Sequence, residues 1–487
     1  MSRRSTWQEI YGRFDPEQSA PREWRADREL SPAEEICRTL DVPFGTPRSL
    51  LTGTIGTGKT TELRRVAEAR AAKGSEFVIF LDLGEHFDKV VGDTTALQHI
   101  DAWEVCALIG VALIRAAKDR LGHEFTKEEI DGLDHAWTAL TSATGTASSS
   151  PHLDVASLAK SMVLLASSFV PHGAAATAGL TAIEKVADAV KWQRSIGLKK
   201  KRLPDQDVEM QSLLGSVNRL IGSFQLRAIP LLLVIDGLDR IRSLAHAKAL
   251  FLDSEMIGQL VCRMVVCGPW ALRHDKATSA VRRFTNLYTL ANEPVLDEAD
   301  PGKEGPGVGF FCEVFQRRTR DLGGGPWISE ALLRRLAYYS GGRGRDFVRS
   351  IRMAAERAWS ADATELTQEI IDAVLDEARR RMETGVDAGD VELLARVAND
   401  PRHALPEGEN ARELLSYGHL LPYPNGSEWF YPHPLLTIRK LPKPPAGPTG
   451  EPTCSGSAGT ACSFWPTELR RLTCASSRAC SCPSTPS

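Results

Sequence analysis

Short uninterrupted runs of apolar residues recur in the first 300 residues, separated by longer stretches of mixed polar and apolar positions. Such runs are typical of parallel strands that are buried on both faces. A long helical region, roughly 94–226, interrupts the series and has breaks at 144–150 and 197–204. Strands separated by helices predict an α/β domain with a parallel sheet. We expect strands at 48–51, 77–81, 229–235, 262–267 and 287–290, and a helix at 59–72.

The pattern becomes helical after about residue 309, where amphipathic segments follow one another with short breaks. Residues 388–438 then contain two short helical patterns and two extended aromatic runs joined by Asn425-Gly426, which is a strong hairpin signal. This order predicts a separate helical domain and then a small winged-helix-like module. The helices of the first of these are expected at 309–321, 328–340, 345–359 and 366–383.

Composition excludes several classes of protein. Of the 487 residues, 42% are hydrophobic and 25% are charged, which excludes global disorder, collagen-like sequence and a coiled-coil rod. The net charge of −3 means that a nucleic-acid site would need a local basic patch.

The N-terminus lacks the apolar segment that a signal peptide requires. Residues 161–183 carry no Asp, Glu, Lys or Arg, but Pro171 at their centre favours two Ala-rich helices over a membrane span.

One glycine-rich segment carries the clearest chemistry. Residues 53–60, GTIGTGKT, fit the pattern G-x-x-x-x-G-K-[ST] at every position, between an expected strand and an expected helix. Glycines let successive N–H groups point at phosphate oxygens, beside a helix N-terminus that favours an anion. We expect Lys59 to reach the β- and γ-phosphates of ATP and the Thr60 hydroxyl to ligate Mg²⁺. The predicted phosphate-binding residues are Gly53, Thr54, Ile55, Gly56, Thr57, Gly58, Lys59, Thr60 and Thr61.

A second apolar run ends in acids. The expected strand at 229–235 leads directly to Asp236, and Asp239 follows about one helical turn later. Asp236 is predicted to hold Mg²⁺, through water, and Asp239 to orient the attacking water. The alternative is that both acids cap the following helix. The phosphate-binding segment upstream favours the metal role for Asp236, whereas both roles stay open for Asp239. With Lys59, these two acids are the candidate catalytic residues.

Together these residues resemble the AAA+/STAND branch of P-loop NTPases, in a bacterial-type AAA ATPase domain protein with a NACHT-like acidic strand end. The usual AAA+ pattern has Glu directly after the metal-binding Asp, but Gly237 stands there in this chain. Arg240 stands where NACHT proteins often have a further acid. The absence of the usual glutamate at 237 implies slow hydrolysis.

The resemblance implies an α/β fold: a parallel-sheet P-loop NTPase core with an α-helical lid domain and a C-terminal winged-helix-like module. The expected parts are an N-terminal extension and entry helix (1–47), the core (48–300, with a helical insertion at about 94–226), the lid (301–385), the winged-helix-like module (386–440) and a disordered Cys/Pro/Ser-rich tail (441–487).

The resemblance also implies nucleotide contacts outside the core. The segment 339–346 resembles the start of the lid helix, where an arginine reaches back to the nucleotide; Arg345 is the first candidate and Arg343 the second. The alternative is a Gly-rich loop with surface arginines. His433, in FYPHPLL, resembles the histidine that contacts the ADP β-phosphate in STAND winged helices, although a lone histidine is usually structural.

Two other AAA+ features are less clear. The strand at 262–267 occupies the place of the sensor-1 strand but ends in Cys267-Gly268-Pro269, so no γ-phosphate sensor is identified. Arg273, Arg282 and Arg283 lie where arginine fingers occur. A solvated basic helix face is the simpler account of any one of them.

The predicted function is a cytoplasmic, ATP-dependent conformational switch in signalling or defence. The expected cofactors are ATP and Mg²⁺, and the expected partners are ADP, a nucleotide-dependent homo-oligomer and an unidentified protein. A DNA-associated regulatory ATPase is one alternative, although 388–438 has nearly balanced charge, which argues against nucleic acid. A membrane-associated, KAP-like P-loop ATPase that uses 161–183 and the basic run 199–202 is another.

The last 47 residues differ from the rest. They are rich in Pro, Ser, Gly and Cys, lack the apolar residues of a core, and carry cysteines without the paired spacing of a zinc site. We expect disorder there. Arg outnumbers Lys in the chain, as in GC-rich genes, so a frameshifted or non-functional extension is the hypothesis for this tail.

Overall fold

Five parallel strands form the central sheet of the computed structural model, which describes residues 3–88, 92–143, 207–276, 278, 284–323, 325–424 and 428–438. The strand order is β2-β3-β4-β1-β5, so β1 has neighbours on both sides. All five predicted strands are confirmed, with ends that differ by one or two residues. Their bounds are β1 (Arg48–Gly53), β2 (Phe77–Asp82), β3 (Leu231–Asp236), β4 (Arg263–Pro269) and β5 (Asn286–Leu290).

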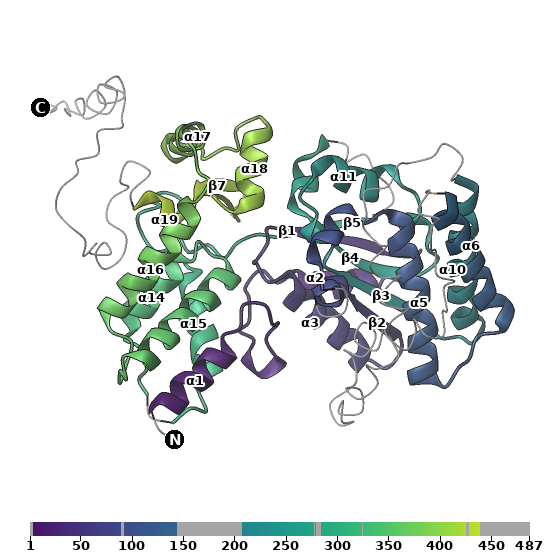
Figure 1. Ribbon diagram of the computed structural model, residues 1–487, viewed down its shortest axis with the longest axis horizontal. Coiled ribbons are helices and arrows are strands. Elements are labelled where there is room, and N and C mark those ends of the chain that lie inside the picture. The colour runs from purple at the N-terminus through teal and green to yellow at the C-terminus, as the bar shows by residue number, and fades with distance from the viewer. Residues whose placement is uncertain are drawn as a thin grey trace, which may run out of the picture. The chain divides into compact units, whose positions relative to one another are not determined.

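Helices cover both faces of this sheet, because alternate residues of each strand point to opposite sides. Leu51, Val78 and Val234 pack with α2 (Pro32–Leu40) and α3 (Lys59–Ala72) on one face. Ile79 and Leu233 pack on the other face with the long helices of the 94–226 region. Figure 1 shows these helices beside the strands. They are α5 (Ala102–Leu121), α6 (Lys127–Ala143) and α10 (Asp207–Leu226).

The lid helices also form as predicted. Helices α13 (Val308–Thr319), α14 (Glu330–Tyr339), α15 (Gly344–Ser360) and α16 (Gln368–Glu383) share one apolar core. The N-terminal residues bring a helix that the sequence analysis did not expect, α1 (Arg3–Arg13). Trp7, Ile10 and Phe14 belong to the same core, so residues 3–14 pack with the lid.

The C-terminal elements follow the order predicted for a winged-helix-like module. Helices α17 (Ala388–Asn399) and α18 (Glu409–Tyr417) precede the antiparallel strands β6 (Leu420–Tyr423) and β7 (Trp429–Pro432), and α19 (Pro434–Thr437) closes the segment. The remaining elements are short: α4 (Leu83–His86), α11 (Leu244–Lys248), η1 (Arg22–Trp24), η3 (Thr94–His99), η5 (Leu238–Arg240), η6 (Ala249–Asp253), η7 (Ile257–Gln259) and η8 (Trp270–His274).

Several predictions lie outside the described residues: the 161–183 stretch, the 199–202 run, the Asn425-Gly426 turn, Arg282, Arg283 and the 441–487 tail. Within the residues that the structure describes, no helix is long and apolar enough to cross a membrane.

Candidate functional site

The glycine-rich segment forms a loop between β1 and α3, at the carboxyl edge of the sheet. Gly56 and Gly58 have φ values of 95° and 101°, which residues with a Cβ rarely adopt. Gly58 caps the N-terminus of α3, where backbone N–H groups and the helix dipole favour an anion. The local geometry is therefore that of a phosphate-binding loop.

Lys59 is held inside this loop. Its Nζ atom donates to the carbonyl oxygens of Gly53 and Thr54, at 2.7 Å each, and lies 2.8 Å from Oδ2 of Asp239. The lysine is 4% exposed, so its charge is almost fully removed from water. Asp239 is therefore the carboxylate that balances the loop lysine.

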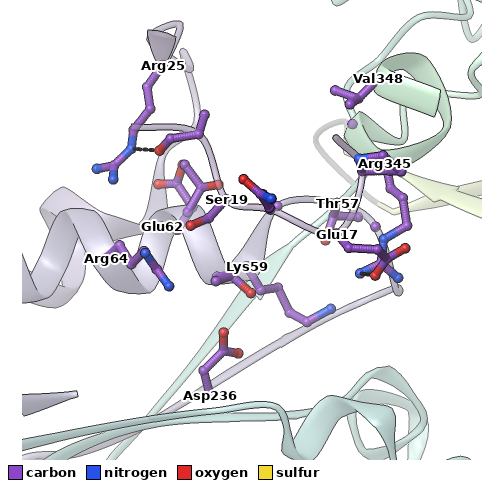
Figure 2. A pocket seen from close by; sticks show the side chains of 18 of the residues that line it. Glu17, Ser19, Arg25, Thr57, Lys59, Glu62, Arg64, Asp236, Arg345 and Val348 are labelled. Atoms are coloured by element: carbon purple, nitrogen blue, oxygen red, sulfur yellow. Dashed lines mark hydrogen bonds and ion pairs between the residues drawn. The ribbon is translucent and has the colours of Figure 1, made fainter. Parts of the chain in front are cut away.

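The other acid, Asp236, ends β3 and accepts a hydrogen bond from the backbone N of Gly237 at 2.8 Å, and the nearby Thr60 side chain acts to lower the Asp236 pKa. The structure thus brings together the two residues that the sequence predicted as Mg²⁺ ligands. Figure 2 shows the Asp236 carboxylate turned toward the loop near Lys59.

The pKa values of Asp236 and Asp239 are shifted in opposite directions. Burial and the neighbouring carboxylates of Asp82 and Asp239 raise the pKa of Asp236 to about 7. Burial alone would raise the pKa of Asp239 as well, but the charge and hydrogen bond of Lys59 hold it below its ordinary value. A divalent cation beside Asp236 would offset the cost of a buried negative charge there.

The donor set fits Mg²⁺. The oxygen atoms of Asp236 and Thr60, which both line the cavity, are the hard ligands that this ion prefers. The Cys267 sulfur and one carboxylate oxygen each from Asp236 and Asp239 all lie within 4.8 Å of one another. Burial raises the pKa of the Cys267 thiol well above its ordinary value, so it stays protonated and is a poor ligand. Cys267 lies within β4, which continues to Pro269, two residues beyond the end that the sequence predicted.

A cavity of about 770 Å³ adjoins the loop and is large enough for a nucleotide. The loop residues 55–61 line it together with Asp236 and Asp239. The lid contributes Gly344, Arg345, Phe347 and Val348. The predicted phosphate-binding loop, the acids and the first-choice arginine therefore surround one cavity.

The two candidate lid arginines contact the loop in different ways. The backbone N of Arg345 donates to the Gly56 carbonyl at 3.0 Å, while its guanidinium lies 3.6 Å from Glu17 (Figure 2). The Arg343 guanidinium donates to the Ile55 carbonyl, with distances of 3.1 Å from Nε and 2.8 Å from Nη2. The start of α15 is thus bonded directly to the phosphate-binding loop.

His433 lies in the interior of the lid and C-terminal elements. Its side chain is fully buried, caps α19 through the backbone N of Leu435, and has Nε2 3.9 Å from Asp346. Burial lowers the pKa of His433 to about 3, so the ring is neutral. His433 is not one of the residues that line the cavity, and its contact with ADP stays a prediction.

Sequence reasoning missed the contribution of the N-terminal segment to this cavity. Residues 15–20, 24–26 and Arg28 line it. Arg28 donates to the Thr57 carbonyl at 2.5 Å and lies 3.2 Å from Glu293. These residues carry no motif that could have identified them. Of the arginine-finger candidates, Arg273 lies 3.9 Å from Glu428, and the other two are outside the described residues.

No protein-family profile and no curated protein matches this chain. Solved structures with a similar fold include Drosophila ORC bound to DNA (13% identity, 80% of this chain and 72% of that chain, TM-score 0.36). The Aeropyrum pernix ORC1 protein in complex with DNA is another (11%, 87% and 93%, TM-score 0.40). A third is the Thermotoga maritima RuvB Holliday junction branch migration motor (14%, 44% and 78%, TM-score 0.24). These likenesses are remote, so the assignment of function rests on the site.

Proposed function

We propose that the protein is an ATP-binding P-loop ATPase of the AAA+/STAND branch that acts as a nucleotide-dependent conformational switch. The observation that carries this proposal is that Thr60 and Asp236 line the same cavity, which is bounded by the phosphate-binding loop and the lid. The fold thus brings the two metal-ligand candidates to one site, although 176 residues separate them in the chain. Among nucleotide-binding folds, this pairing is specific to P-loop NTPases.

Each residue then has a role in binding. The N–H groups of the loop and Lys59 would hold the phosphates of ATP, and Thr60 and Asp236 would hold Mg²⁺, which neutralises phosphate charge. Arg345 would add a guanidinium from the lid. Hydrolysis is expected to be slow because Gly237 replaces the usual glutamate.

The switch would work through the lid. Two carbonyl groups of the loop, those of Ile55 and Gly56, accept hydrogen bonds from Arg343 and Arg345 at the start of α15. A loop that closes on phosphate would change these bonds, so ATP and ADP would favour different lid arrangements. The output in signalling or defence, the cytoplasmic location, the nucleotide-dependent homo-oligomer and the protein partner remain parts of this proposal.

Nucleotide binding tests the site. Replacing Lys59 by Ala removes a buried, charge-assisted contact to phosphate, so ATP affinity should fall by about 100-fold or more. Titration of fluorescent ATP against the purified variants measures this effect. Lys73→Ala is the matched control, because Lys73 lies at the other end of α3 and forms an exposed ion pair with Asp41. ATP affinity that survives in Lys59→Ala would reject the site.

The two sequence-based alternatives need separate tests. A DNA-associated regulatory ATPase would retain duplex DNA at low salt and release it as salt rises. A membrane-associated ATPase would sediment with membranes when the expressed protein is fractionated.

A further inference from the structure

The position after Asp236 has no room for a side chain. Gly237 has a φ of 95°, in the left-handed region. A Cβ at Gly237 would collide with the backbone N of Gly84, in α4. The backbone that follows β2 thus fills the space that a glutamate at 237 would need. A carboxylate for the attacking water must come from another element.

The end of β2 brings such a carboxylate to the same edge. Asp82 is the register partner of Asp236 in the parallel pairing of β2 with β3. Residues in register on neighbouring parallel strands point to the same face of the sheet. Asp82, Asp236, Lys59 and Thr60 all line the cavity.

The Asp82 side chain is held by two neighbouring elements. Its Oδ1 atom accepts a hydrogen bond from the backbone N of Glu85 at 2.8 Å, which caps α4. Its Oδ2 atom lies 3.5 Å from Nη2 of Arg64, which is one helical turn beyond Thr60 on α3. The side chain is 13% exposed, so a fixed charge faces a site that is partly shielded from water. Asp239, by contrast, is committed to Lys59.

We propose that Asp82 is the carboxylate that orients the attacking water, in the place of the missing glutamate; this inference rests on the proposed ATPase function. The water oxygen forms a bond to the γ-phosphorus while the bond from that phosphorus to the bridging β–γ oxygen breaks. The electron pair of the broken bond leaves with ADP. One water proton passes to the Asp82 carboxylate and from there to solvent, and the products are ADP and phosphate.

The experiment compares Asp82→Asn with wild-type full-length protein in ATP binding and in single-turnover ATP hydrolysis. Asn is nearly isosteric and is also a good N-cap, so the variant keeps the α4 cap and loses only the charge. We expect kcat to fall by about 100-fold or more, with ATP affinity within about threefold of wild type. Asp387→Asn is the matched control, because Asp387 caps α17 in the same way and does not line the cavity; it should leave kcat unchanged.

Each outcome is decisive. Turnover by Asp82→Asn within a few fold of wild type would overturn the inference, as would wild-type protein that binds ATP without hydrolysing it. A loss of turnover in Asp239→Asn or Glu85→Gln that Asp82→Asn does not share would assign the role to that residue instead. Failure of wild-type protein to bind ATP would reject the proposed function itself, which is a distinguishable result.

Discussion

Buried carboxylates in this protein differ by the partners that they find. Asp236 faces other acids, and its pKa rises. The Glu76 side chain is 2% exposed, but it accepts hydrogen bonds from Arg70 (2.7 Å and 2.8 Å) and from Arg263 (2.6 Å). Burial alone would raise the pKa of Glu76, and these arginines together hold it below the ordinary value of 4.5. One acid suits a site that binds a cation, and the other stabilises the fold.

Glu76→Gln should therefore destabilise the protein by about 3 kcal/mol near pH 7, because it removes the carboxylate charge that pairs with both Arg70 and Arg263. A group with a lowered folded-state pKa contributes stability above its unfolded pKa, and that stability is lost as pH falls through the folded pKa. The difference between the variant and wild type should shrink below about pH 4.5, where Glu76 of the unfolded chain takes up a proton, and should vanish once Glu76 of the folded protein is protonated as well. Urea unfolding at several pH values measures it, and a pH-independent difference would contradict the ion-pair account.

At the scale of elements, α1 is the helix that the sequence pattern did not reveal. It is short and mostly polar, and its apolar residues Trp7 and Ile10 pack against the lid core. Trp7 is 1% exposed, donates from Nε1 to the Ala363 carbonyl at 2.8 Å, and meets Trp327 edge-on. The N-terminal segment that lines the cavity is thereby anchored to the lid at its start, whereas Arg25 and Arg28 tie its later part to α3 and to the loop.

Trp7→Ala should cost about 3–5 kcal/mol of lid stability, because it empties a buried site and removes a hydrogen bond. Trp359→Ala is the control: Trp359 is 44% exposed on α15, and its loss should cost less than about 1 kcal/mol. Urea unfolding midpoints compare the two. If the midpoint shift of Trp7→Ala is as small as that of Trp359→Ala, α1 adds little to the stability of the lid.

At the scale of the whole molecule, one side chain joins three parts. Arg343 contacts the Ile55 carbonyl in the loop, lies 3.0 Å from Asp346 at the start of α15, and packs against Gly418 before β6. A Cβ on Gly418 would collide with this guanidinium, which shows how closely the C-terminal elements approach it. Arg343 is therefore placed to carry a change in the loop to the C-terminal elements.

Arg343→Ala should remove the difference between the ATP-bound and ADP-bound forms in size-exclusion chromatography and limited trypsin digestion, while ATP affinity changes by less than about tenfold. Arg357 also lies on α15, where it forms a partly exposed ion pair with Glu377 of α16, and Arg357→Ala should keep that difference. A nucleotide response that is unaltered in Arg343→Ala would argue for another route to the lid.

Much of the core and of the phosphate site could be predicted from the sequence. The β1–loop–α3 unit, the apolar strands, the lid helices and the places of Lys59 and Thr60 at the start of α3 and of Asp236 at the end of β3 all depend on local patterns. Glycines set the loop backbone within a few residues, and apolar runs mark buried strands. The order of β2, β3, β4 and β1 in the sheet was not predicted, since strand pairing joins residues far apart in the chain.

The sequence by itself determined that a glycine-rich loop leads into a helix and that a buried strand ends in an acid, because each depends on residues that lie next to one another. Only the tertiary structure decided what surrounds them. Strand register placed Asp82 beside Asp236. The backbone of α4 packs against Gly237, which has a positive φ, and leaves no room for a glutamate side chain at that position. Contacts across hundreds of residues brought Glu17, Arg28 and Arg345 to one cavity. Such contacts arise when a chain buries its apolar surface as a whole, so no short pattern records them.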